Sequence, residues 1–278
     1  MAAAPTLRSA HRGVERHRVW LGAAVPGDVV GNFGSALDLL GQQATYLYRE
    51  GERYWYDTQA SVTRTAADKA EALRDQPEEA WQELVERMRR SVPKHRGGFA
   101  GVHVAPESSA DIPDTDAARL VVLHPSHPHT KGAGDSAAML FAHDAFERRG
   151  NAQRTNRNMV VFLAPDGKRL DELLQATREF LAWTWVHQRR EELNLSPTQV
   201  KQVDGNVTRA DEIVNARIAE TYHWVLVPEQ LDPQAPADIV VEKADGANER
   251  LAERVTDRLT RSGLLTGQLA PRTIRLEL

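Results

Sequence analysis

A glycine-rich loop between a predicted strand and a predicted helix contains the side chains best suited to contact an anion. The loop reads Lys131-Gly132-Ala133-Gly134-Asp135-Ser136. Such loops bind phosphates because the amides at a helix N-terminus point toward the anion. In a Walker loop the lysine follows the glycines, whereas here it precedes them, so Mg-ATP binding of the Walker kind is not predicted. A flexible turn is the more common use of loop glycines, and weak anion contact through Lys131 and Ser136 is the functional alternative.

Three histidines, His124, His127 and His129, lie close together after the same predicted strand. Imidazole clusters bind zinc and other transition metals when the geometry permits. The spacing fits no recognised metal motif, and two prolines constrain the backbone between the histidines. Ordinary polar loop histidines are therefore the plain interpretation, and a small metal-dependent hydrolase is the alternative.

Arg157 and Asn158 immediately precede a continuous apolar run, Met159 to Ala164. The guanidinium of Arg157 can reach a phosphate or a carboxylate, as an arginine finger does. The alternative is an ion pair with Asp166 or Asp171 that anchors the end of the strand. The sequence leaves both open. It contains no readable Ser-His-Asp order and no nucleophile elbow, so no complete catalytic site is predicted.

Two groups of basic residues are candidates for nucleic-acid contact. The first is a predicted β-hairpin with Gly51 in its turn, in which Arg49 and Arg53 can contact phosphates while an aromatic side chain stacks on a base. The structural alternative is that Tyr46, Tyr48, Tyr54, Trp55 and Tyr56 form cross-strand pairs. The second group lies at the end of a predicted helix and comprises Arg87, Arg90, Lys94 and Arg96. Here the alternative is a solvated helix end whose cations are favoured by the helix dipole.

The elements that position these residues follow from periodicity. The run from Met159 to Ala164 does not alternate, which predicts a strand covered on both faces. Residues 170–185 repeat apolar side chains at helical spacing. Strand and helix patterns alternate from about 119 to 193, which favours a parallel pair with a right-handed crossover. Further strands are predicted at residues 223–227, 239–242 and 273–276, and helices at 206–222 and 251–262.

The predicted fold class is α/β, or α+β over the whole chain. A helix within residues 33–48 followed by the hairpin matches the second half of a winged helix. A charged helical region with a pause at Asp75-Gln76-Pro77 follows. We therefore expect a loose lead-in over residues 1–18, a winged-helix-like and helical region over 19–96, and an α/β domain with a mostly parallel sheet over 97–278.

Composition limits the function classes. The 278 residues carry a formal net charge of -4, so the whole chain is not a polycation that seeks nucleic acid. The absence of cysteine excludes disulfides, thiol nucleophiles and cysteine-ligated zinc. No apolar run approaches the roughly 20 residues of a membrane span, and the first residues lack the apolar centre of a signal peptide. We expect a cytoplasmic protein with no membrane partner.

Several of these stretches occur together in a recognisable order. They are Phe33–Leu37, Ala44–Tyr48, Arg53–Gln59, Arg157–Asp166 and Leu181–Trp183. Over about residues 18 to 278 the chain resembles the large prokaryotic family of AAA+-like ATP-binding proteins catalogued as domain of unknown function 499. Members often occur beside restriction, methylation or phage-defence genes. Arg157 and Asn158 match the family motif.

The resemblance implies a parent protein that uses ATP and magnesium. Family members are longer and carry a P-loop ATPase region upstream, and no Walker residue of this chain matches it. The chain is thus expected to be a DNA-directed accessory portion that has no catalysis and no cofactor of its own. It would dock onto the ATPase core of the same protein or of partner subunits, in an oligomer where the parent forms one. The alternatives are a stand-alone nucleic-acid-binding module and, behind it, the metal-dependent hydrolase.

Overall fold

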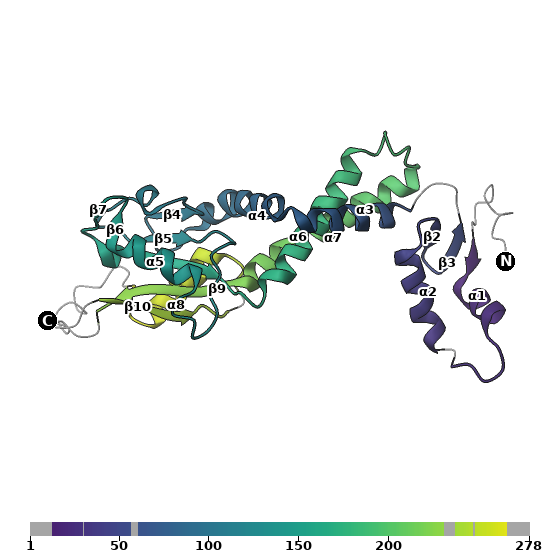
Figure 1. Cartoon of the computed structure of the whole chain (residues 1–278), viewed down its shortest axis with the longest axis horizontal. Helices are drawn as coiled ribbons and strands as arrows, with labels where there is room; N and C mark the ends of the chain where they lie inside the picture. The colour runs from purple at the N-terminus through teal and green to yellow at the C-terminus, as the bar shows by residue number, and fades with distance from the viewer. Residues whose placement is uncertain (1–12, 30, 57–60, 231–236, 247, 266–278) are drawn as a thin grey trace. The chain divides into compact units, whose positions relative to one another are not determined.

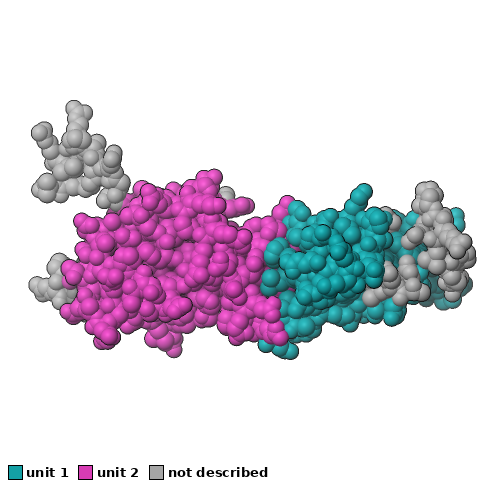
Figure 2. Space-filling model, turned by 90° about the horizontal axis from the view of Figure 1, so that it is seen from above, with its two compact units in different colours: residues 1–75, 179–208 teal, residues 76–178, 209–278 magenta. Residues whose placement is uncertain are grey.

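The computed structural model describes residues 13–29, 31–56, 61–230, 237–246 and 248–265. Contacts divide the chain into two compact units, residues 1–75 with 179–208 and residues 76–178 with 209–278 (Figure 2). This division differs from the expected boundary between residues 96 and 97, because residues 76–96 pack with the C-terminal unit and residues 179–208 with the N-terminal one. Every helix in the described ranges falls short of the length and apolar character needed to cross a membrane.

The first unit begins with a winged-helix-like module, defined here as residues 13–56 (Figure 1). Its elements are β1 (Val14–Glu15), α1 (Arg16–Ala23), α2 (Gly31–Gln43), β2 (Leu47–Glu50) and β3 (Arg53–Tyr56). The strands pair antiparallel in the order β1-β3-β2. Gly51 adopts a φ of +57° in the β2–β3 turn, a conformation that glycine accepts without steric cost. The predicted helix followed by a hairpin is confirmed.

The aromatic side chains of the hairpin mostly serve packing. Tyr48 and Trp55 face each other across β2 and β3, and their stacked rings lie 5.7 Å apart between centroids. Both side chains are buried, and so is Tyr54. The cross-strand interpretation is therefore confirmed for Tyr48 and Trp55, whereas Tyr54 packs with Leu37 and Leu47. Tyr46 and Tyr56 instead remain exposed.

Regular structure starts earlier than Val19. Val14 pairs with Tyr54 in the small sheet, and the Arg16 backbone N–H donates to the Glu52 carbonyl at 2.7 Å. The expected loose lead-in is therefore wrong for residues 14–18, because pairing with a strand 40 residues away is invisible in the local composition. Residues 1–12 lie outside the described part of the chain.

The remainder of the first unit is helical. It contains α3 (Val62–Ala72) with a short 3₁₀ turn (Leu73–Asp75), the C-terminal part of α6 (Leu170–Gln188) and the N-terminal part of α7 (Pro197–Thr221). Their core is built from Val62, Ala66, Val186 and Val203. The predicted pause at residues 75–77 is confirmed, since α4 (Pro77–Ser91) begins at Pro77.

Helix α7 begins at Pro197, well before residue 206, where the prediction placed its start. The cause is a reciprocal cap. The Ser196 backbone N–H donates to Gln199 Oε1 at 2.9 Å, and the Gln199 N–H donates to Ser196 Oγ at 3.4 Å. Serine followed three residues later by glutamine is a recognised capping pattern, so this part of the helix was readable from the sequence and was missed.

The second unit is built on a five-stranded sheet of order β10-β9-β8-β5-β4 (Figure 1). Its strands are β4 (Gly101–Val104), β5 (Arg119–Val122), β8 (Val160–Pro165), β9 (Tyr222–Glu229) and β10 (Asp238–Lys243). The β4–β5 and β5–β8 pairs are parallel, whereas β8–β9 and β9–β10 are antiparallel. The predicted α/β class is confirmed, with a mixed sheet. The antiparallel half arises because α6 and α7 bring the chain back to the edge where β8 ends, so that Tyr222 at the start of β9 pairs with Pro165.

The core of this unit lies around β8. All six β8 residues are buried, as the unbroken apolar run predicted. Val160, Phe162 and Ala164 pack in one cluster with residues of α5 (Ala137–Glu147). Helix α5 follows β5 in the chain, and the two short strands β6 (Arg148–Arg149) and β7 (Ala152–Gln153) lie between α5 and β8. Helix α8 (Leu251–Arg261) completes the unit. The predicted strand at residues 273–276 lies outside the described residues.

Candidate functional site

One edge of the sheet brings together the loops that contain most of the polar candidates. Strands β5 and β8 run parallel, and β10 points the same way because two antiparallel pairings separate it from β8. The segments that follow these strands therefore meet at one edge, where open α/β sheets commonly bind ligands. The His129 N–H donates to the Pro165 carbonyl and the Gly167 N–H donates to the His129 carbonyl, both at 2.9 Å. These bonds hold the loop after β5 beside the loop after β8.

Asp166 is the centre of the polar network at this edge. Its Oδ1 accepts the Lys168 backbone N–H at 2.7 Å, and its Oδ2 accepts the Trp224 indole N–H at 2.9 Å. His223 Nε2 lies 3.2 Å from the same Oδ2. Burial raises the pKa of Asp166, but the Lys168 amide and the Trp224 indole outweigh it, so the pKa lies below its usual value. The carboxylate is therefore ionised at neutral pH and fully engaged.

The lowered pKa of Asp166 makes unfolding of the second unit pH-dependent. Because the pKa is lower folded than unfolded, Asp166 contributes stability above its unfolded pKa, near 3.8, which is lost as pH falls through the folded value. We expect Asp166→Asn to be less stable than the wild type at pH 7 and the gap to close below about pH 4. Urea unfolding at several pH values measures this. Asp144→Asn, which removes an exposed carboxylate of α5, is the control, and an unchanging gap would contradict the assignment.

His129 and Ser136 form a second polar pair. His129 is buried, and its Nδ1 lies 2.8 Å from Ser136 Oγ. Ser136 Oγ also accepts the Met139 N–H at 3.3 Å, which makes Ser136 the N-cap of α5. The His129 ring packs edge-on against Trp224 at 5.3 Å. Burial lowers the pKa of His129 below its usual value, so the imidazole is neutral at neutral pH. The pair orders the glycine-rich loop.

The three histidines do not converge on a metal site. His124 Nδ1 contacts Ser126 Oγ at 2.7 Å, and the His127 ring packs on Phe141 at 5.4 Å. His129 is held by Ser136 instead. No group of three or more His, Cys, Asp or Glu side chains within the described ranges is arranged to hold a metal ion. This arrangement therefore does not support the alternative of a metal-dependent hydrolase that uses the three histidines.

The predicted anion-contact residues separate into two places. Lys131 and Ser136 follow β5, whereas Arg157 and Asn158 precede β8 in a 3₁₀ turn (Arg157–Met159). Since β5 and β8 are parallel, the end of one strand lies at the opposite edge from the start of the other. Arg157 lies over the Phe146 ring at 5.7 Å, and its Nε donates to the Arg154 carbonyl at 3.3 Å. It forms no ion pair with Asp166 or Asp171, both of which the structure describes, so that alternative is wrong.

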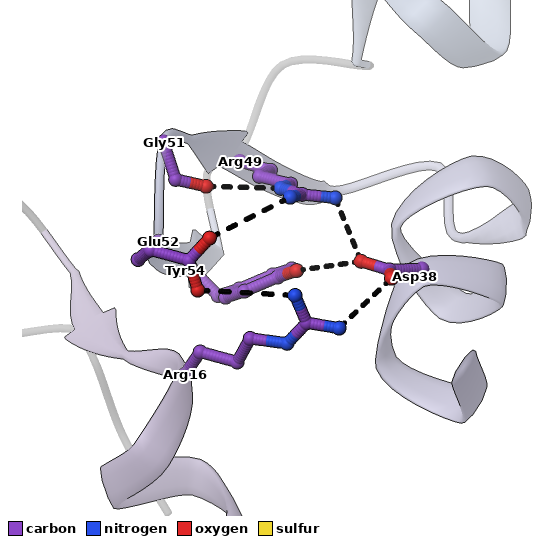
Figure 3. Close-up of polar contacts among 6 residues, drawn as sticks. All are labelled: Arg16, Asp38, Arg49, Gly51, Glu52 and Tyr54. Carbon is purple, nitrogen blue, oxygen red and sulfur yellow. Dashed lines mark hydrogen bonds and ion pairs between the residues drawn. The ribbon is translucent and has the colours of Figure 1, made fainter. Parts of the chain in front are cut away.

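Three of the four arginines of the winged-helix-like module pair with carboxylates of the same module, and Figure 3 shows two of them, Arg16 and Arg49. Asp38 of α2 accepts from Arg49 Nη1 at 2.7 Å, from Arg16 Nη2 at 2.9 Å and from the Tyr54 hydroxyl at 3.1 Å. Arg53 pairs with Glu15 at 3.2 Å. Arg49 and Arg53 therefore bind the hairpin to the rest of its own module. Because both guanidinium groups already have carboxylate partners, the structure does not support the prediction that they contact nucleic acid.

Arg87 is also unsuited to bind nucleic acid. Only 9% of its surface is exposed, and its guanidinium pairs with Glu83 at 2.6 Å and with Asp211 at 2.7 Å. The local cluster of basic residues could not reveal a partner on α7. The other members of the predicted patch are exposed: Arg90, Lys94 and Arg96.

Two buried arginines escaped the sequence analysis. Arg154 donates to the carbonyls of Ala145, Pro113 and Ile112 at 2.7 to 3.1 Å. Arg254 donates to the carbonyls of Ala219 and Tyr222 near the end of α7.

The partners of both arginines are backbone carbonyls, which no pattern of side chains in the sequence can predict.

None of the protein families, curated proteins or solved structures with which this chain was compared matches it.

Proposed function

We propose that this chain is the non-catalytic accessory portion of an AAA+-like ATP-binding protein. In this proposal, the winged-helix-like module docks onto the ATPase core of the same protein or of a partner subunit. The sequence contains no P-loop, and Arg157, the residue that matched the family motif, packs on Phe146. The chain itself is therefore assigned docking, and ATP hydrolysis is assigned to the core.

The observation that carries the proposal is where the exposed apolar side chains lie. Of the ten large apolar side chains that are exposed among the described residues, seven belong to this module. They are Leu21, Val25, Val29, Leu39, Leu40, Tyr46 and Tyr56. Isolated exposed apolar residues are ordinary, but seven of them within a module of 44 residues favour a module that another protein covers.

The charge of the module favours a protein partner over nucleic acid. Helix α2, the counterpart of a recognition helix, contains no lysine or arginine and carries the acidic Asp38. The module as a whole has four arginines and five carboxylates. Nucleic-acid binding depends on cations that neutralise phosphates, and three of the four arginines already bind carboxylates of the module. An apolar, nearly neutral surface matches the apolar surface of a protein.

A nucleic-acid-binding module remains the second candidate because Arg90, in the last turn of α4, and Lys94 and Arg96, which follow that helix, are all exposed. Binding through these residues would fall steeply as salt rises, because counterions released from the phosphates drive it. Docking through the apolar module would vary little with salt. The two candidates are therefore separable by ionic strength.

The docking proposal is tested by calorimetric titration of this chain with the isolated P-loop ATPase region of a longer member of the family that the chain resembles. We expect stoichiometric binding that changes little with salt. Replacing Leu39 and Leu40 together with glutamate is expected to weaken binding by about tenfold or more, because charge at an apolar interface is left unpaired. Both side chains are about half exposed, so the variant is expected to fold.

The matched control replaces Leu140 and Ile213, two exposed apolar residues outside the module, with glutamate. It should bind as the wild type does. An equal loss in both variants, or no binding by the wild type, would contradict docking through the module. In the same assay, binding to a short DNA duplex that weakens steeply with salt would favour the second candidate.

A further inference from the structure

A cleft of about 650 Å³ opens at the polar edge of the sheet in the second unit. It lies beside the loop after β8, the start of β9 and the end of β10, with Lys131 from the loop after β5 at its margin. Since β8 and β10 point the same way, the cleft lies at the carboxyl ends of both strands, a common position for ligands in open α/β sheets. The volume is within the usual range for small-molecule sites.

Basic side chains dominate the lining of this cleft. They are Lys131, Lys168, Arg169, Lys243 and Arg258. The acidic lining residues are Asp166 and Glu242, and both already have partners. Asp166 accepts the hydrogen bonds described above, and Glu242 pairs with Arg258 at 3.0 Å. The Asp166 carboxylate keeps its negative charge, because these donors are neutral N–H groups, but the five basic lining residues still outnumber the two acidic ones.

Three of the cations have no carboxylate partner in the described part of the chain. Lys131 and Lys168 are exposed and make no ion pair there. Arg169 Nη1 donates to the Glu220 carbonyl at 2.9 Å, which leaves its charge uncompensated. Lys243, by contrast, pairs with Asp245 at 3.2 Å. A concave cleft with three unpaired cations concentrates positive potential and attracts an anion.

The loop that presents two of these cations is already ordered. Asp166 Oδ1 accepts the Lys168 N–H at 2.7 Å, and the Asp166 carbonyl accepts the Arg169 N–H at 3.1 Å. Asp166 is in turn fixed by the Trp224 indole. The backbone at Lys168 and Arg169 is therefore already fixed before a ligand binds, which lowers the entropic cost of binding.

We propose that this cleft binds a small phosphorylated molecule, with Lys131, Lys168 and Arg169 contacting the phosphate. A phosphate carries about two negative charges and several acceptor oxygens, which match a group of convergent donors. The half-buried Val240 and Val241 provide an apolar wall for the organic part. The cations surround one hollow rather than a stripe, which favours a small molecule over a nucleic-acid backbone. This inference is independent of the docking proposal.

The test measures binding of inorganic pyrophosphate and of AMP to the full chain by calorimetry at low salt. We expect both to bind the wild type. The variant in which Lys131 and Lys168 are both replaced by glutamate is expected to bind at least about tenfold more weakly, since two attractive charges become repulsive. The control replaces the exposed Lys201 and Arg209, which lie outside the cleft, with glutamate. It carries the same change in net charge and should bind within about twofold of the wild type.

Three outcomes would overturn the proposal. The first is that neither ligand binds the wild type. The second is that the Lys131 and Lys168 variant binds as well as the control, which would place any binding elsewhere. The third is that a single-stranded oligonucleotide binds through Lys131 and Lys168 while pyrophosphate and AMP do not. Because both lysines are exposed, circular dichroism is expected to show an unchanged fold in both variants.

Discussion

Replacing Phe162 with alanine is expected to lower the free energy of unfolding of the second unit by about 3 to 5 kcal/mol. Phe162 lies in β8, between the parallel partner β5 and the antiparallel partner β9, and none of its surface is exposed. Its ring packs in the cluster that joins the sheet to α5. Alanine would leave a cavity that a strand bonded on both sides cannot close.

Urea unfolding followed by circular dichroism measures this loss. Leu140→Ala, in the exposed face of α5, is the control and is expected to change stability by less than about 0.5 kcal/mol. Phe162→Leu should fall between the two, because most of the volume is kept. A loss for Phe162→Ala no larger than that of the control would mean that β8 is not the centre of the core.

Arg154→Met is expected to be nearly as damaging, by about 2 to 4 kcal/mol, although it retains a long side chain. Only 2% of Arg154 is exposed, and its guanidinium satisfies three backbone carbonyls. One of them belongs to Ala145, in the last turn of α5, where the helix leaves carbonyls without partners. Methionine fills the space but donates nothing, so buried acceptors lose their hydrogen bonds.

The control for this change is Arg148→Met, which removes an exposed arginine from the same connection. It should leave the urea midpoint nearly unchanged. Arg154→Lys is expected to be intermediate, since a single ammonium cannot reproduce the forked geometry of the guanidinium. If Arg154→Met unfolded at the same urea concentration as Arg148→Met, the three hydrogen bonds would contribute nothing to stability.

These two positions differ in how far the sequence could reveal them. Phe162 lies in an unbroken apolar run, and such a run predicts a strand buried on both faces without reference to any other part of the chain. Arg154 lies in a polar segment of residues 151–156, and nothing near it in the sequence distinguishes it from an exposed arginine. Its partners are carbonyls about 40 residues earlier and at the end of α5.

The residues of the candidate site could also be predicted only in part from the sequence. Lys131 and Ser136 were expected beside a helix N-terminus, and Ser136 does cap α5. The other two anion-contact candidates, Arg157 and Asn158, lie at the opposite edge of the sheet, because they precede β8 whereas Lys131 and Ser136 follow the parallel strand β5. Lys168 and Arg169 were missed, although their position directly after a predicted buried strand was a usable signal.

Local patterns determined most of the elements. Apolar periodicity, proline at a helix start and glycine in a turn act through neighbours in the chain, so they can be read from the sequence alone. Tertiary contacts decided which charges are neutralised. Arg49, Arg53 and Arg87 look like free cations in sequence, yet each has a carboxylate partner brought to it by folding. The antiparallel direction of β9, the division into two units and the cation-lined cleft were decided in the same way. They depend on segments that are distant along the chain, and local sequence does not encode the meeting of such segments.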